Sequence, residues 1–173
     1  MRTRRQRLRA AGFTILELLF LIAALSAVSA LAIPQAMKPR LRHNEEVAAD
    51  YLAMIRTAQQ YWLETESTRG TLSQLCSGIE LLPLAFQPGL DGVVQRGGYR
   101  FREGFFADVT PGEDLAPAGC WAWPTLWGYS GGQVLWLDYT SGEIHEVDAS
   151  YSGKGEPPLT PPSATGLGPV ISR

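Results

Sequence analysis

The chain has 173 residues, of which 45% are hydrophobic and 18% charged, and its formal net charge is −2 at pH 7. The first twelve residues carry five arginines and no acid, so the rest holds ten Lys and Arg against seventeen Asp and Glu, a net charge near −7. A chain this acidic is a poor candidate for binding nucleic acid through bulk electrostatics, and none is expected among its partners. The length fits one ordinary domain plus an anchor.

The basic leader, residues 1–12, is followed by an apolar run over residues 13–33. These twenty-one residues would form about 31 Å of helix, enough to cross the hydrocarbon core of a bilayer. Because basic residues stay cytoplasmic, the leader predicts a single-pass helix with a cytoplasmic N-terminus and a translocated C-terminal domain. Small residues recur along the run, which allows close contact with other helices.

One carboxylate, Glu17, lies inside the apolar run. An acid in such a helix costs about 2.5–3.5 kcal/mol on insertion scales, which indicates a function beyond anchoring. Glu17 is expected to pair with a positive group, since a carboxylate and an ammonium each lower the other's cost in lipid. The competing interpretation is a plain signal-anchor whose acid is tolerated near the interface.

This stretch resembles the N-terminus of type IV prepilins and type II secretion pseudopilins. The matching positions are Gly12, which ends the basic leader, then Phe13, Thr14, Glu17 and Pro34. The resemblance implies cleavage between Gly12 and Phe13 by a prepilin peptidase, which would also N-methylate Phe13. The new amino group of Phe13 would pair with Glu17 of a neighbouring subunit during filament assembly.

The resemblance also implies partners and a location. The partners are the prepilin peptidase, other pilin or pseudopilin subunits, and the inner-membrane assembly platform. The subunit would be stored in the inner membrane and then enter a filament. The sequence does not separate a type IV pilus from a secretion pseudopilus or a DNA-uptake pilus. A second, less specific resemblance to pilin-like proteins covers residues 128–144, where an aromatic strand, an acid and a Ser-Gly turn precede an isoleucine.

Residues 34–66 are expected to form the amphipathic helix of a pilin domain. Pro34 and Pro39 would kink or loosen it, so its continuity with the apolar run stays open. One apolar stripe should pack on a sheet. Its members are Val47, Tyr51, Met54, Ile55, Ala58, Tyr61 and Trp62.

Residues 67–150 are predicted to form a connector, with a short helix within 72–84, and then an antiparallel sheet of about four strands. Residues 151–173 form a Pro/Gly-rich tail without period, expected to be extended or disordered. The predicted fold is therefore α+β and pilin-like: a long N-terminal helix, transmembrane in its first half, packed on a C-terminal antiparallel sheet.

Two cysteines, Cys76 and Cys120, favour a disulfide in a translocated domain, with two buried free thiols as the alternative. Their spacing and that of the two histidines suit no metal site. Acidic residues near the chain's last strand are interpreted as solvated charges, because no Asp-rich calcium loop is present. They are Asp138, Glu143, Glu146 and Asp148.

Four tryptophans, Trp121, Trp123, Trp127 and Trp136, lie close together in the sequence. Alternation places the first two on one face of a strand. We interpret the group as packing between sheet and helix; the alternative is an aromatic patch that binds a glycan or peptide on a membrane-tethered binding module. No nucleophile–base arrangement or phosphate loop is recognised, so neither an enzyme nor a cofactor is expected.

Overall fold

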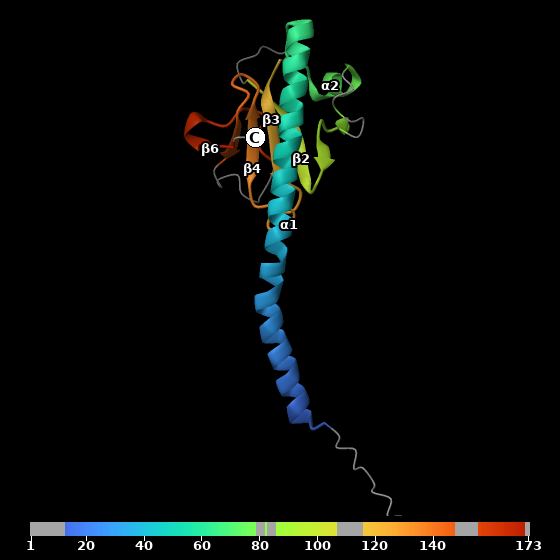
Figure 1. Cartoon of the computed structure of the whole chain (residues 1–173), viewed down its shortest axis with the longest axis vertical. Helices are drawn as coiled ribbons and strands as arrows, with labels where there is room; N and C mark the ends of the chain where they lie inside the picture. The colour runs from blue at the N-terminus through green and yellow to red at the C-terminus, as the bar shows by residue number, and fades with distance from the viewer. Residues whose placement is uncertain (1–12, 79–81, 83–85, 107–115, 148–155, 172–173) are drawn as a thin grey trace, which may run out of the picture. The chain divides into compact units, whose positions relative to one another are not determined.

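The computed structural model describes residues 13–78, 82, 86–106, 116–147 and 156–171 (Figure 1). The chain divides into two compact units, Met1–Lys38 and Pro39–Arg173. The elements are α1 (Ile15–Glu66), α2 (Leu72–Gly78), β1 (Val94–Arg96), β2 (Tyr99–Phe105), β3 (Pro117–Pro124), β4 (Val134–Asp138), β5 (Ile144–Val147), the 3-10 helix η3 (Ala164–Gly166) and β6 (Leu167–Val170). A long helix and an antiparallel sheet confirm the α+β class.

Helix α1 is 52 residues long and includes both Pro34 and Pro39. The backbone therefore stays helical past Pro34, although each proline removes one N–H donor from the hydrogen-bond ladder. The helix ends where Ser67 adopts a positive φ of 58° and its N–H donates to Leu63 O at 3.0 Å. A left-handed residue of this kind stops a helix because the next residues turn away from its axis.

The sheet has six strands in the order β1-β2-β3-β4-β5-β6, and every neighbouring pair is antiparallel. The prediction of about four strands was wrong, because it missed the two edge strands, β1 and β6. Strand β1 joins β2 through Gly97 and Gly98, which have φ values of 55° and 79°. Two consecutive left-handed residues are what a tight hairpin turn requires, so Gly-Gly was a usable signal. Strand β6 contains Pro169, and its Pro/Gly composition placed it in the predicted tail.

One face of the sheet packs on the α1 residues of the second unit (Figure 1). The buried positions of α1 are Ala48, Ala49, Leu52, Ile55, Ala58 and Gln59. The predicted stripe was correct at Ile55 and Ala58 but wrong at Met54 and Tyr61, whose exposed fractions are 37% and 53%. Ala48, Ala49 and Ala58 permit close approach of the helix to the sheet, and Leu52 and Ile55 fill the core between them. Tyr51 and Trp62 of the predicted stripe also pack against this core, partly buried.

The opposite face of the sheet has its own cluster of buried residues, which includes Trp121, Trp123 and Trp136. Part of residues 156–171 packs on this side: Leu167 lies against the cluster, and the N–H of Phe105 donates to Leu159 O at 2.7 Å. Ile171, by contrast, packs against the core between sheet and helix. This part of the predicted tail, residues 156–171, is therefore ordered and is called the C-terminal layer below; its strand β6 pairs with β5 at the edge of the sheet. Residues 151–155 and 172–173 lie outside the described residues.

Candidate assembly segment and neighbouring sites

The first unit presents an apolar helix surface that nothing within the described chain covers. None of the side chains described between residues 13 and 38 is buried. Phe13 is 78% exposed and Ile15 is 81% exposed. By length and composition, α1 is the one helix among the described residues that could cross a membrane. Apolar area of this extent is stable only in lipid or against other chains.

The start of α1 is closed by reciprocal hydrogen bonds between Thr14 and Glu17. The N–H and the Oγ1–H of Thr14 both donate to Glu17 Oε2, each at 2.9 Å, and the N–H of Glu17 donates to Thr14 Oγ1 at 3.2 Å. This is a capping box, in which the first and fourth residues satisfy each other's backbone donors. The T-x-x-E spacing ahead of an apolar run was the signal for it, and the sequence interpretation missed it.

The capping box fixes where the carboxylate of Glu17 points. Both Thr14 donors hold Oε2, whereas Oε1 accepts no hydrogen bond from the residues that the structure describes. The carboxylate is therefore turned toward the N-terminal end of the helix and keeps one oxygen available. A cation approaching the helix start would meet that oxygen directly.

The two serines of the apolar run make hydrogen bonds within their own helix. The hydroxyls of Ser26 and Ser29 donate to the carbonyls of Ile22 and Leu25, each at 2.8 Å. Such bonds to the preceding turn remove the cost of an unpaired hydroxyl in lipid. Glu17 is the one acidic or basic residue between residues 13 and 33. It is therefore the side chain of the run whose charge calls for a partner outside its own helix.

The two cysteines are free and buried, so the expected disulfide between Cys76 and Cys120 is not formed. The thiol of Cys76 donates to Phe86 O at 3.1 Å, and both cysteines belong to the core between sheet and helix. Burial, and then the nearby Glu103 carboxylate, raise the pKa of both thiols. A thiol held in its protonated form is a poor nucleophile for disulfide exchange.

Glu103 is an acid of the second unit with a largely buried carboxyl group. It lies on β2 opposite Cys120, and its Oε1 accepts a hydrogen bond from the N–H of Leu72 at 2.6 Å. Burial raises its pKa to about 7, an effect that the Leu72 hydrogen bond partly offsets. Sequence reasoning gave Glu103 no role, because a single acid in an alternating strand carries no signal of burial.

The aromatic patch, which was the alternative to packing, is not a surface. Trp121, Trp123 and Trp136 have exposed fractions of 0%, 5% and 3%, and only Trp127 of the four is half-buried. The rings of Trp121 and Trp136 pack at 4.8 Å between centroids, and the Arg102 guanidinium lies 5.4 Å from the Trp123 ring. Packing is confirmed for three tryptophans, although they face away from α1 and toward the C-terminal layer.

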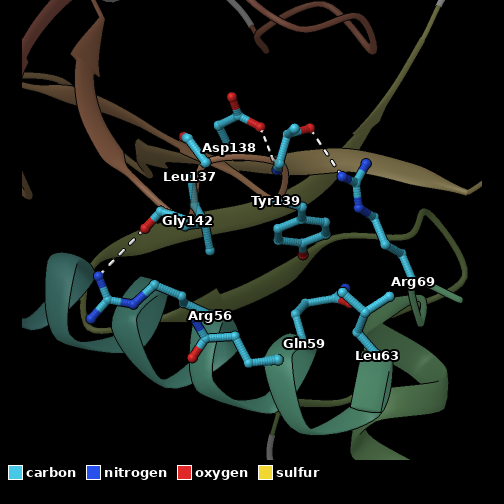
Figure 2. A pocket seen from close by; sticks show the side chains of 11 residues that line it. Arg56, Gln59, Leu63, Arg69, Leu137, Asp138, Tyr139 and Gly142 are labelled. Carbon is cyan, nitrogen blue, oxygen red and sulfur yellow. Dashed lines mark hydrogen bonds between the residues drawn. The ribbon is translucent and has the colours of Figure 1, made fainter. Parts of the chain in front are cut away.

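A small cavity of about 200 Å³ lies between α1 and the turn that joins β4 to β5 (Figure 2). Two arginines enter it from opposite ends: Arg69 Nη2 donates to Thr140 Oγ1 at 3.0 Å, and Arg56 Nη1 contacts Gly142 O at 3.4 Å. Gln59 bonds Gly70 in both directions and so positions Arg69. These contacts fasten the turn to the helix, and the cavity holds no paired nucleophile and base.

The described residues contain no group of three or more His, Cys, Asp or Glu side chains that would suit a metal ion. Asp148 lies outside the described residues. No family model, curated protein or solved structure matches the chain.

Proposed function

We propose that the chain is a prepilin-like structural subunit, processed by a prepilin peptidase and assembled into a type IV pilus or a type II secretion pseudopilus. One observation carries the proposal. A glycine that ends a five-arginine leader is followed at once by an apolar run whose side chains are exposed over residues 13–30, with a single acid in the first turn of its helix. An anchor alone explains the apolar helix, but neither the glycine nor the acid.

The second unit supports the same function. Its stretch of α1 lays alanine, leucine and isoleucine side chains on an antiparallel sheet, while Met54 and Tyr61 stay exposed. A subunit built this way keeps a folded domain outside the membrane and leaves its helix available for contact with other helices. Burial of that helix among its copies would drive polymerisation.

The mechanism proposed for assembly is ion pairing at the helix start. Cleavage after Gly12 would make Phe13 the N-terminus and give it an ammonium group. The Glu17 carboxylate, turned toward the helix start by Thr14, offers Oε1 to the ammonium of a neighbouring subunit. Both charges are costly alone in an apolar interior, so the pair would set the register between subunits.

The alternative function is a membrane-tethered extracytoplasmic binding module. It rested on an aromatic platform, and the burial of Trp121, Trp123 and Trp136 removes most of that surface. It also leaves Glu17 without a role. The proposal of a filament subunit is therefore preferred.

The test is the intact mass and N-terminal peptide of the chain purified from its native host. A chain that begins at N-methylated Phe13 is the expected result. A Gly12→Val variant, expected to keep residues 1–12, is the matched control for cleavage at that bond. If the wild-type chain still begins at Met1 while the peptidase processes other substrates, the tethered module becomes the better assignment.

A further inference from the structure

The cavity between α1 and the turn that joins β4 to β5 has a net positive lining (Figure 2). All of its lining residues belong to the second unit, Pro39–Arg173. Arg56 and Arg69 are the two basic residues of the lining, and Asp138 is its one acid. Asp138 Oδ1 accepts a hydrogen bond from the N–H of Thr140 at 2.7 Å, which ties that carboxylate to its own turn. Two permanently charged guanidinium groups therefore face a single carboxylate, and the cavity favours an anion.

The two guanidinium groups contact only neutral oxygens of the turn through the hydrogen bonds that join it to α1. Arg56 Nη1 lies 3.4 Å from Gly142 O, longer than the roughly 2.7–3.2 Å of an ordinary N–H···O bond, so this contact is weak. Arg69 Nη2 donates to Thr140 Oγ1 at 3.0 Å, which uses one of the five donors of a guanidinium. A carboxylate is a stronger acceptor than a neutral oxygen. Each end of the cavity would therefore gain from a bound carboxylate.

The wall between the two arginines is largely apolar. Leu63 and Leu137 line it, and Figure 2 shows the ring of Tyr139 between Arg56 and Arg69. Such a wall suits a short hydrocarbon chain, whose burial removes apolar surface from water. The cavity volume of about 200 Å³ is below the roughly 300–1,000 Å³ of sites for drug-sized ligands, so the occupant must be small.

We propose that this cavity binds a short aliphatic dicarboxylate, with one carboxylate on Arg56 and the other on Arg69. The planar fork of a guanidinium matches a carboxylate through two parallel hydrogen bonds. The methylene groups of the ligand would lie against Leu63, Leu137 and the Tyr139 ring. A ligand bound in this way joins the turn to α1 more firmly than the present contacts do. The inference goes beyond the proposed function and does not depend on it, because it concerns the second unit alone.

The test is calorimetric titration of the purified full-length chain in detergent at low salt. The probes are succinate, glutarate and adipate, which lengthen by one methylene at a time, with acetate and inorganic phosphate as anions charged at one centre. The best dicarboxylate should bind with a Kd of about 1 mM, an ordinary affinity for about nine non-hydrogen atoms. It should bind about tenfold more tightly than acetate or phosphate. Equal binding of all five would indicate a plain anion site and overturn the proposal, as would no saturable binding of any dicarboxylate.

Substitution of either arginine tests the two ends of the site separately. Arg56→Gln and Arg69→Gln should each weaken binding of the best dicarboxylate about tenfold, because each removes a charge-assisted pair of hydrogen bonds. Arg100→Gln is the matched control, since Arg100 pairs with Glu156 at 3.6 Å and does not line the cavity. An equal loss in the control, or no loss in either cavity variant, would overturn the assignment.

A measurement on the unsubstituted chain locates the ligand even if an arginine variant fails to fold. Saturating dicarboxylate should slow hydrogen exchange in peptides that cover residues 137–143, where the N–H of Gly142 donates to Asp138 O at 2.8 Å. Peptides that cover residues 126–133 should exchange at an unchanged rate. Binding that leaves residues 137–143 unprotected would place the ligand elsewhere and overturn the site.

Discussion

Glu103 on β2 accepts a hydrogen bond from the backbone N–H of Leu72, the first residue of α2, at 2.6 Å. The contact joins the sheet to the connector helix, but it places a carboxyl group in a largely buried position. Burial raises the pKa of Glu103 to about 7 from an ordinary value of 4.5. Folding therefore favours the protonated acid, and the ionised form lowers stability.

The first prediction follows from the sign of that shift. The contribution of Glu103 to the free energy of unfolding is greatest below pH 4.5 and declines as the pH rises toward 7. Above pH 7 this contribution no longer changes with pH. Glu103→Gln keeps an acceptor for Leu72 and cannot ionise, so it should be more stable than the wild type at pH 8 by about 2–3 kcal/mol. The two should agree near pH 4.5. Urea midpoints across this range give the comparison, and a gap that does not depend on pH would contradict it.

The second prediction concerns the thiols. Because Cys76 and Cys120 are free and buried, the folded chain should take up no maleimide, whereas the chain unfolded without reductant should take up two per molecule. A disulfide would instead give none in either state until a reductant is added. Mass spectrometry of the chain purified from its native compartment separates the two outcomes.

A third prediction tests the packing of β3 on β4. A Cβ added at Gly119 would lie 2.2 Å from Leu137 O and 2.4 Å from Trp136 Cζ2. Since a backbone carbonyl in a paired strand cannot move aside, Gly119→Ala should lower the free energy of unfolding by about 1–3 kcal/mol. The melting temperature should fall by several degrees. Gly132→Ala is the control, as its nearest neighbour is Glu45 Oε1 at 3.4 Å. Equal melting temperatures for the two variants would argue against this register.

The C-terminal layer gives a fourth prediction. Arg102 donates to Pro157 O, pairs with Glu156 at 2.9 Å and lies on the Trp123 ring. Arg102→Met should loosen the start of the layer, residues 156–159, from β2 and speed proteolysis there, at a stability loss of about 1–2 kcal/mol, while β6 stays paired with β5. Arg100→Met removes only a 3.6 Å pair to the same glutamate and should change little. Hydrogen exchange of the amide of Phe105, bonded to Leu159 O, reports release directly.

The sequence was most informative where one pattern sufficed. Periodicity and composition located the long helix, and the Ser141-Gly142 turn located the hairpin of β4 and β5. Features that depend on distant neighbours were missed. The side of α1 that is buried depends on where the sheet lies. Trp121 packs on the side of the C-terminal layer, and the sequence of β3 alone does not predict that this layer covers it. Composition also misled at β6, where pairing with β5 overrides a Pro/Gly-rich sequence.

The cysteines show the same limit at the candidate sites. An even count in a translocated domain favours a bridge, but bridging needs two sulfurs aimed at each other. Here Cys76 donates to Phe86 O and Cys120 contacts Trp121 O at 3.6 Å. At Glu17 the sequence identified the acid as a candidate site residue. The T-x-x-E capping box in the same four residues was a local signal, and it was overlooked.

The last prediction concerns that capping box. Thr14→Val removes the hydroxyl that donates to Glu17 Oε2 and accepts from the N–H of Glu17, while the backbone donor at position 14 remains. The Glu17 carboxylate then loses one of the two hydrogen bonds that hold Oε2. Its orientation is less fixed, so the ion pair at the helix start should form less readily. The expected yield of sheared filaments lies between those of the wild type and Glu17→Ala, with cleavage after Gly12 unchanged. Thr14→Ser restores the hydroxyl and should restore the yield. A Thr14→Val chain that assembles as well as the wild type would show that the hydroxyl does not position Glu17.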